Sequence, residues 1–84
     1  MPAPMIYVQS ARQTDDITSC LHDRASSLRV ANVGNSVELG DGREWLITLT
    51  PSGGGSTVAV QHATNVSENI PEPEMRFDIA RCTI

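Results

Sequence analysis

The sequence contains no lysine, so every one of its six basic residues is an arginine. Chemistry that requires a lysine is excluded, including Schiff-base formation and the phosphate contact of a P-loop. The net charge is −4, and the arginines are scattered along the chain rather than gathered in a cluster. Nucleic acids and anionic lipids are bound through basic faces. We therefore expect neither of them as a partner.

Large aromatic rings are scarce as well, with one Trp, one Tyr and one Phe in 84 residues. The length predicts a single domain, and a domain this small has a limited core that benefits from a covalent constraint. No apolar run approaches the roughly 20 residues of a membrane-spanning helix, so no transmembrane span is expected. The first residues also lack the charged and apolar regions of a signal peptide. Either the protein is cytosolic or a signal segment has been removed ahead of Met1.

The strongest helical pattern lies in residues 14–28. Thr14 suits the N-cap position, and Asp15 and Asp16 fall in the first turn, where negative charge interacts favourably with the helix dipole. Apolar side chains recur at helical spacing and predict one stripe facing the core, made of Ile17, Cys20, Leu21, Ala25 and Leu28. The segment is therefore expected to be an amphipathic helix with Cys20 on its inner face.

Three later segments, 36–39, 43–50 and 57–63, alternate between apolar and polar residues. This pattern predicts an antiparallel sheet with one buried face. The turn signals Asp41-Gly42 and "PSGGGS" (51–56) predict hairpin connections, and we expect Asp41 and Glu44 to be solvated there. A further strand pair involving "LRVANV" is open, because Gly34 and Asn35 leave its register undefined.

The two ends of the chain are more ambiguous. Residues 1–13 contain "PAP" and are expected to form a tail or tether, although "IYV" (6–8) also suits an edge strand. At the other end, Pro73 suits the first position of a helix, and an apolar spacing of i, i+4 and i+7 favours a short helix over a strand. We therefore expect one α+β domain over residues 14–84. Its N-terminal and short C-terminal helices would pack on a three- or four-stranded antiparallel sheet.

The chain has two cysteines, Cys20 and Cys82, and both fall on predicted apolar faces. A disulfide between them would close a loop of more than sixty residues and stabilise the fold by about 4 kcal/mol. It would also indicate an oxidising compartment, in which case the signal segment has been removed. One alternative is two buried free thiols in a cytosolic protein.

A second alternative is a zinc site made of Cys20, His22, His62 and Cys82. Positions i and i+2 of a helix point in different directions, so one metal ion cannot easily reach both Cys20 and His22. The sequence also lacks a C-x-x-C pair. We expect no metal and no other cofactor.

No catalytic constellation is visible in the sequence. His22 suits the polar side of its helix, His62 continues the apolar face of a strand, and "GGGST" lacks the lysine and helix of a phosphate-binding loop. Asn65-Val66-Ser67 matches the glycosylation pattern, which carries meaning only in a secretory context. An enzyme would need His62 beside a carboxylate in a pocket, and we expect the protein not to be an enzyme.

The layout of "SCLHDR", "WLITLTPSGGGSTVAVQHA" and the terminal "ARCTI" resembles small exported bacterial envelope proteins of uncharacterised function, many of them lipoproteins. The resemblance implies a periplasmic, outer-envelope-associated or secreted location. It is also compatible with a lipid anchor upstream of this sequence. It covers most of the chain in layout and contains no diagnostic motif, so it assigns no functional residue.

These observations predict a non-enzymatic exported protein that acts through protein contacts. The contact surface would be the Thr-rich sheet face at Thr48, Thr50 and Thr57, or an edge strand at residues 6–8. The alternative is an inhibitor or binding module for a secreted hydrolase or a small ligand, with an inserted loop at 51–56 or 64–73. The sequence does not indicate the oligomeric state.

Overall fold

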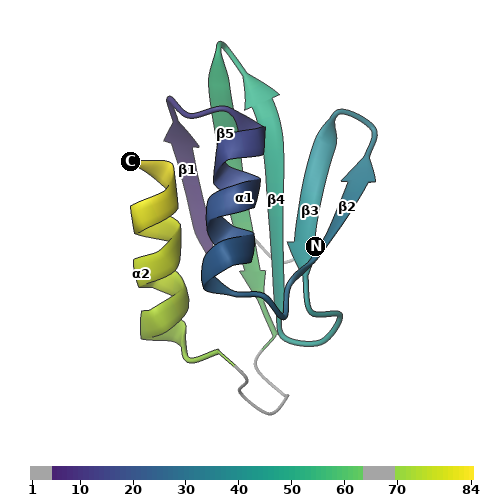
Figure 1. Ribbon diagram of the computed structural model, residues 1–84, viewed down its shortest axis with the longest axis vertical. Helices are drawn as coiled ribbons and strands as arrows, with labels where there is room; N and C mark the ends of the chain where they lie inside the picture. Colours follow the sequence, from purple (N-terminus) through teal and green to yellow (C-terminus); the bar gives the residue numbers. More distant parts are fainter. Residues whose placement is uncertain (1–4, 64–69) are drawn as a thin grey trace.

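The computed structural model describes residues 5–63 and 70–84. In chain order these residues form β1 (Ile6–Ser10), α1 (Thr14–Arg24), β2 (Arg29–Val33), β3 (Ser36–Gly40), β4 (Trp45–Ser52), β5 (Gly55–His62) and α2 (Glu72–Thr83). The strands form one antiparallel sheet in the order β1-β5-β4-β3-β2. The two helices of the described residues lie on the same face of this sheet, and neither of them lies on the opposite face (Figure 1). The α+β class and the short C-terminal helix are confirmed.

The predicted number of strands is wrong, because the sheet has five strands rather than three or four. β1 comes from the segment for which a tail and an edge strand were both open, and it is a strand that pairs along β5, with Val8 opposite Val58. The expected boundary at Thr14 therefore falls inside the folded unit. The open pair at "LRVANV" is resolved as the β2–β3 hairpin, which turns at Gly34 with a φ of 60°. Both additions depend on pairing partners that short strand patterns do not reveal.

Two connections in the sheet follow their turn signals. β4 and β5 are joined by the two-residue turn Gly53–Gly54, whose φ angles of 55° and 88° are both positive, as in a type I′ turn. Ser52 lies opposite Gly55 at its base. β3 and β4 are joined by residues 41–44, with Gly42 at a φ of 80°. The two hairpins predicted at these positions are confirmed.

The helix starts differ from the prediction by one position each. Thr14 is the first helical residue rather than the N-cap, which is Gln13. The Gln13 side chain makes no capping bond and instead donates to the Gly54 carbonyl at 2.7 Å. α2 is capped by Pro71, which places Pro73 at the second helical position. These small shifts leave both apolar stripes facing the sheet.

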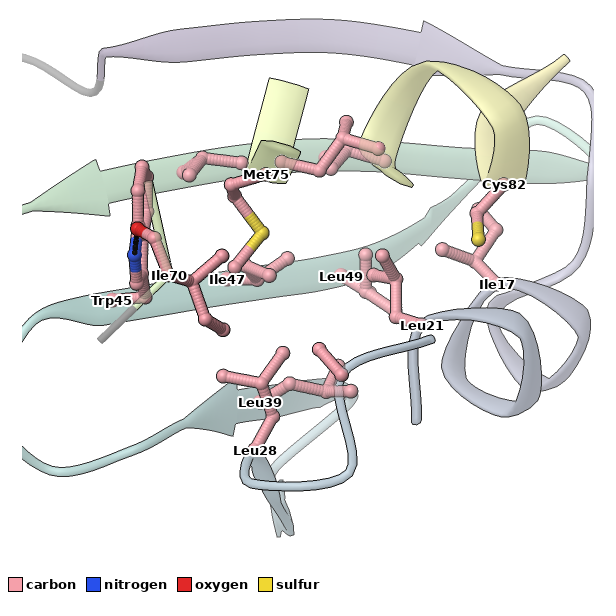
Figure 2. Close-up of a cluster of buried hydrophobic side chains, with 14 residues drawn as sticks. Ile17, Leu21, Leu28, Leu39, Trp45, Ile47, Leu49, Ile70, Met75 and Cys82 are labelled. Carbon is pink, nitrogen blue, oxygen red and sulfur yellow. Dashed lines mark hydrogen bonds between the residues drawn. The ribbon is translucent and has the colours of Figure 1, made fainter. Parts of the chain in front are cut away.

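The core lies between the helices and the sheet (Figure 2). Alternate residues of β4 and β5 point into it, as their sequence pattern predicts, and α1 and α2 supply the opposite wall. Its buried members are Ile17, Leu21, Ala25, Leu28, Leu39, Trp45, Ile47, Leu49, Val58, Val60, Ile70, Met75, Ile79 and Cys82. At one end the Trp45 indole N–H donates to the Ile70 carbonyl at 3.1 Å, so the one polar atom of that ring is satisfied.

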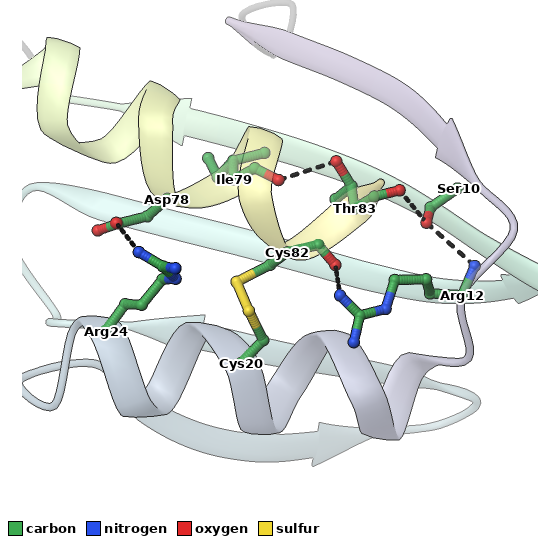
Figure 3. The surroundings of a disulfide bond; sticks show 8 residues. All are labelled: Ser10, Arg12, Cys20, Arg24, Asp78, Ile79, Cys82 and Thr83. Atoms are coloured by element: carbon green, nitrogen blue, oxygen red, sulfur yellow. Dashed lines mark hydrogen bonds and ion pairs between the residues drawn. A yellow bond between two sulfur atoms is a disulfide. The ribbon is translucent and has the colours of Figure 1, made fainter.

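A disulfide joins Cys20 of α1 to Cys82 of α2 (Figure 3). Their Cα atoms are 5.6 Å apart, and the two residues are separated by 62 positions in sequence. The predicted pairing is therefore present. Arg12 donates to the Cys82 carbonyl at 3.0 Å, and the Ser10 hydroxyl donates to the Thr83 carbonyl at 2.6 Å. These bonds satisfy carbonyls at the end of α2 that have no partner within the helix. A disulfide of this kind is consistent with an oxidising location.

Candidate functional site

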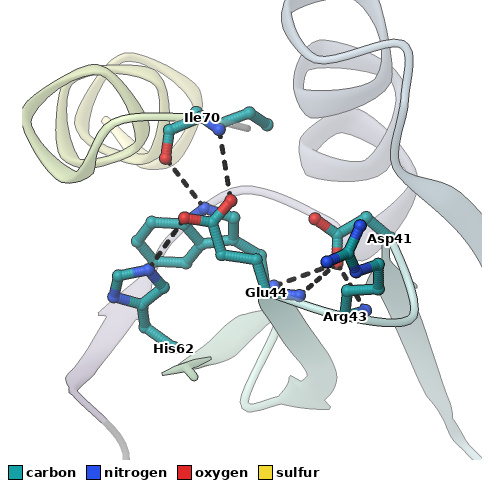
Figure 4. Close-up of polar contacts among 6 residues, drawn as sticks. Asp41, Arg43, Glu44, His62 and Ile70 are labelled. Atoms are coloured by element: carbon teal, nitrogen blue, oxygen red, sulfur yellow. Dashed lines mark hydrogen bonds and ion pairs between the residues drawn. The ribbon is translucent and has the colours of Figure 1, made fainter. Parts of the chain in front are cut away.

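A polar network closes the end of the core where β4 begins and β5 ends (Figure 4). The Glu44 carboxylate is at its centre. One oxygen lies 3.0 Å from Nε2 of His62, and the other accepts the backbone N–H of Ile70 at 3.2 Å. The His62 ring stacks on the Trp45 indole, with the ring centroids 3.9 Å apart and the planes inclined by 11°. One carboxylate thus holds a histidine that also packs against the only Trp.

The expectation that Glu44 is solvated is wrong, because only 3% of the residue is exposed. Its neighbour Asp41 explains the inward turn. One Asp41 carboxylate oxygen accepts backbone N–H groups from Arg43, Glu44 and Trp45, at 2.9, 2.7 and 3.1 Å. These bonds tighten the connection between β3 and β4 and direct the Glu44 side chain toward the core end.

The same bonds set the acidity of Asp41. Partial burial raises the pKa of this carboxyl, whereas the hydrogen bonds from the backbone amides of Arg43, Glu44 and Trp45, and from its own amide, lower it. The net result is a pKa below the usual value for Asp. Asp41 therefore acts as a charged acceptor that stabilises the loop.

A shallow depression of about 440 Å³ lies beside this network. Its lining is largely apolar and includes Leu46, Trp45 and Ala63, with polar groups from Arg43, Gln61 and His62. Since Glu44 is bonded to Nε2 of His62, the other ring nitrogen is directed away from the carboxylate (Figure 4). A histidine oriented by a carboxylate can donate or accept a hydrogen bond at its second nitrogen.

The arrangement set out above as a requirement for an enzyme, His62 beside a carboxylate in a pocket, is therefore present among the described residues. However, none of the described residues that line the depression is a serine, threonine or cysteine, so no side-chain nucleophile of that kind faces His62. The zinc set considered above is not assembled either, because Cys20 and Cys82 are bonded to each other and His22 is exposed on α1. In residues 5–63 and 70–84, no group of three potential metal ligands comes together.

The helix-free side of the sheet is a second candidate site. Alternate residues of β1, β5 and β4 lie on it, and we call this surface the open-face patch: Tyr7, Gln9, Leu46, Thr48, Thr50, Thr57, Ala59 and Gln61. None of these residues carries a charge, although 19% of the chain is charged. Tyr7 is 63% exposed, and the three threonines are half-buried.

Sequence reasoning found part of these sites. It assigned Thr48, Thr50 and Thr57 to one face of the sheet, and the structure places them there together. It missed Glu44 as the partner of His62, because that contact depends on the pairing of β4 with β5 and on the Ile70 amide 26 positions away. Loop 51–56 forms the β4–β5 turn and its flanks, whereas residues 64–69, including the Asn65–Ser67 pattern, lie outside the described residues.

Comparison with known protein families, curated proteins and solved structures finds no match for this chain. Among the helices in the described part of the chain, neither is long and apolar enough to cross a membrane.

Proposed function

We propose that the protein is a non-enzymatic, exported protein that acts by binding another protein through its open-face patch. The observation that carries this proposal is the absence of charge across three adjacent strands. Surfaces that stay in water usually carry Lys, Glu and Asp, whereas the centres of protein interfaces are depleted in charged residues and enriched in Tyr. A surface that combines exposed Tyr7 with threonines and Leu46 fits that composition.

The geometry of the patch supports the same role. β1, β5 and β4 are paired in continuous register, so their side chains project from a rigid sheet. The Thr50 hydroxyl is further held by the Ser36 hydroxyl, 3.0 Å away on the neighbouring strand. A preorganised surface loses little conformational entropy when it binds. The disulfide between the helices favours a partner in an oxidising compartment, such as the periplasm or the cell exterior.

Site-specific photo-crosslinking tests this proposal. A photoreactive amino acid at Thr48 should trap a partner in the source organism's envelope or secreted fraction, whereas the same group at Asp23, exposed on α1, should not. With the trapped partner purified, Thr48→Arg should weaken binding by about tenfold or more, because a charge is then buried in the interface. Asp23→Arg is the matched control and should bind normally. Equal trapping at both positions would refute the open-face patch as the binding surface.

The depression beside His62 supports a second candidate, the binding of a small ligand. Its carboxylate-held histidine and its largely apolar lining suit a small molecule that presents one polar group. The two candidates differ in their tests. A fragment screen monitored by NMR should shift the resonances of His62 and Ala63 if a ligand binds there. Thr48→Arg should leave those shifts unchanged, since Thr48 does not line the depression.

A further inference from the structure

β2 forms an exposed edge of the sheet. All five residues of the strand are exposed, including Val30 at 45% and Val33 at 52%. β2 pairs with β3 on one side, and among the described residues no strand pairs with its other side. In Figure 1 the outer edge of β2 lies on the side of the sheet away from both helices, so neither of them covers this edge.

The register identifies which peptide groups are free. Residues of an antiparallel pair alternate between hydrogen-bonded and non-hydrogen-bonded positions. The two-residue turn at Gly34 makes Val33 and Ser36 a bonded pair, so Ala31 and Arg29 also bond to β3. The N–H and C=O groups of Val30 and Asn32 therefore point outward. These four groups have no strand partner among residues 5–63 and 70–84.

β2 also lacks the features that usually prevent edge pairing. Edge strands are commonly protected by lysine, proline or a bulge. β2 has none of these, since its register with β3 is continuous over five residues and Arg29 is its only charge. β1 is the other edge of the sheet, but it is less open, because its last residue, Ser10, is 8% exposed and donates to the end of α2.

We propose that β2 pairs with β2 of a second copy of this chain, antiparallel and about a two-fold axis at Ala31. This register pairs all five residues of the strand, with Val30 bonded to Asn32 of the other copy. Two small Ala31 side chains then face each other at the closely spaced, non-hydrogen-bonded position. The two five-stranded sheets become one continuous sheet of ten strands.

The self-complementary register about Ala31 supports the second copy as the occupant, and the charges on this face are compatible with it. Glu38 lies opposite Ala31 on β3, on the same face of the sheet. In the dimer, Arg29 of one copy faces Val33 of the other, and the small Ala31 side chains leave its long side chain a path to Glu38. The axis creates two such pairs. Within one copy, neither Arg29 nor Glu38 forms an ion pair with a described residue.

Sedimentation velocity of the oxidised full-length chain over a range of concentrations tests the proposal. We expect a species of twice the 9.1 kDa chain mass. Asn32→Pro removes the outward amide and leaves the β2–β3 bonds intact. Because two amides are lost per dimer, it should raise the dissociation constant by about 30-fold. The matched control is Gln9→Pro, which removes an outward amide from β1 and should leave the dimer unchanged.

Three further variants keep the test decisive if Asn32→Pro disturbs the hairpin. Val30→Lys keeps every backbone group and places an edge lysine on the pairing strand, so it should also weaken the dimer. Ala31→Cys should form an intermolecular disulfide on oxidation, whereas Val33→Cys, which faces Arg29, should not. A wild-type monomer at every concentration, loss of the dimer in Gln9→Pro alone, or cross-linking at Val33→Cys instead of Ala31→Cys would each overturn the proposal. The test is independent of the proposed function, because β2 is not part of the open-face patch.

Discussion

The Glu44 carboxylate lies 3.0 Å from Nε2 of His62, and only 1% of the Glu44 side chain is exposed. Trp45 pairs with His62 at the end of the β4–β5 ladder, and this pairing brings the side chain of Glu44, the residue before Trp45, next to that of His62. A buried carboxylate is costly unless each of its oxygens is bonded. Here the imidazole and the Ile70 amide provide those bonds, which ties the start of β4 to the segment that leads into α2.

Glu44→Ala should therefore lower the free energy of unfolding by about 2–4 kcal/mol, because it leaves the buried Ile70 amide and the His62 ring without their acceptor. Glu44→Gln, which retains an acceptor, should cost less. Urea denaturation monitored by Trp45 fluorescence measures both. Glu74→Ala is the control, since Glu74 is exposed on α2 and its loss should cost less than about 0.5 kcal/mol. An equal effect of Glu44→Ala and Glu74→Ala would show that the network contributes no stability.

The Cys20–Cys82 bond closes a loop over most of the chain, so its removal should also lower the free energy of unfolding. The chain-entropy model gives a loss of about 4 kcal/mol for Cys20→Ser combined with Cys82→Ser, a large share of the roughly 5–15 kcal/mol typical of domains. Thermal denaturation of the variant against the oxidised wild type measures this loss.

Mass spectrometry of the purified wild type provides the control. After denaturation without a reductant, neither cysteine should react with an alkylating agent. Two alkylations would contradict the disulfide.

The elements that were predictable from sequence are those specified by local patterns. The apolar stripe of α1, the alternation in β4 and β5 and the Gly53–Gly54 turn each depend on residues close in the chain, and each was found. The disulfide was inferred because only two cysteines exist and both fall on apolar faces. A binary choice of this kind is unusually favourable for sequence reasoning.

The features that escaped prediction or stayed open depend on distant partners. For β1 the local sequence left a tail and an edge strand open, and its pairing with β5, about fifty positions later in the chain, decides for the strand. Glu44 follows a turn, where charged residues are normally solvated, and nothing local indicates that the Ile70 amide will meet it. Burial of a polar group is decided by its tertiary partners. The core of the fold could therefore be predicted from sequence, whereas the edge strands stayed open and the polar network was missed.

The lowered pKa of Asp41 predicts a specific pH dependence. Because its folded pKa lies below the usual value of 3.8, Asp41 contributes stability that is fully present above that value and is lost as the pH falls through the folded pKa. Asp41→Asn removes this contribution. The difference in free energy of unfolding between wild type and variant should be constant from pH 7 to about pH 5 and should shrink below about pH 4. Urea titrations at several pH values measure it, and a difference that persists unchanged to pH 2 would contradict the assignment.

A substitution at Gly55 is expected to disturb β1 rather than the β4–β5 turn. A Cβ atom at this position would overlap the backbone oxygen of Ser10, so Gly55→Ala should push the end of β1 away from β5. Hydrogen exchange measured by NMR should then show faster exchange at Val8 and Ser10, whose amides face β5, than at Ile47 in the centre of the sheet.

Gly53→Ala is the matched control for that experiment. It strains the turn at a φ of 55°, at a cost of about 1–2 kcal/mol, but has no neighbour on β1. It should therefore raise exchange without singling out β1. If both variants accelerated Val8 and Ile47 by the same factor, the close approach of Ser10 to Gly55 would not be what holds β1. The sheet would then behave as a single cooperative unit, and β1 would detach only when the whole domain unfolds.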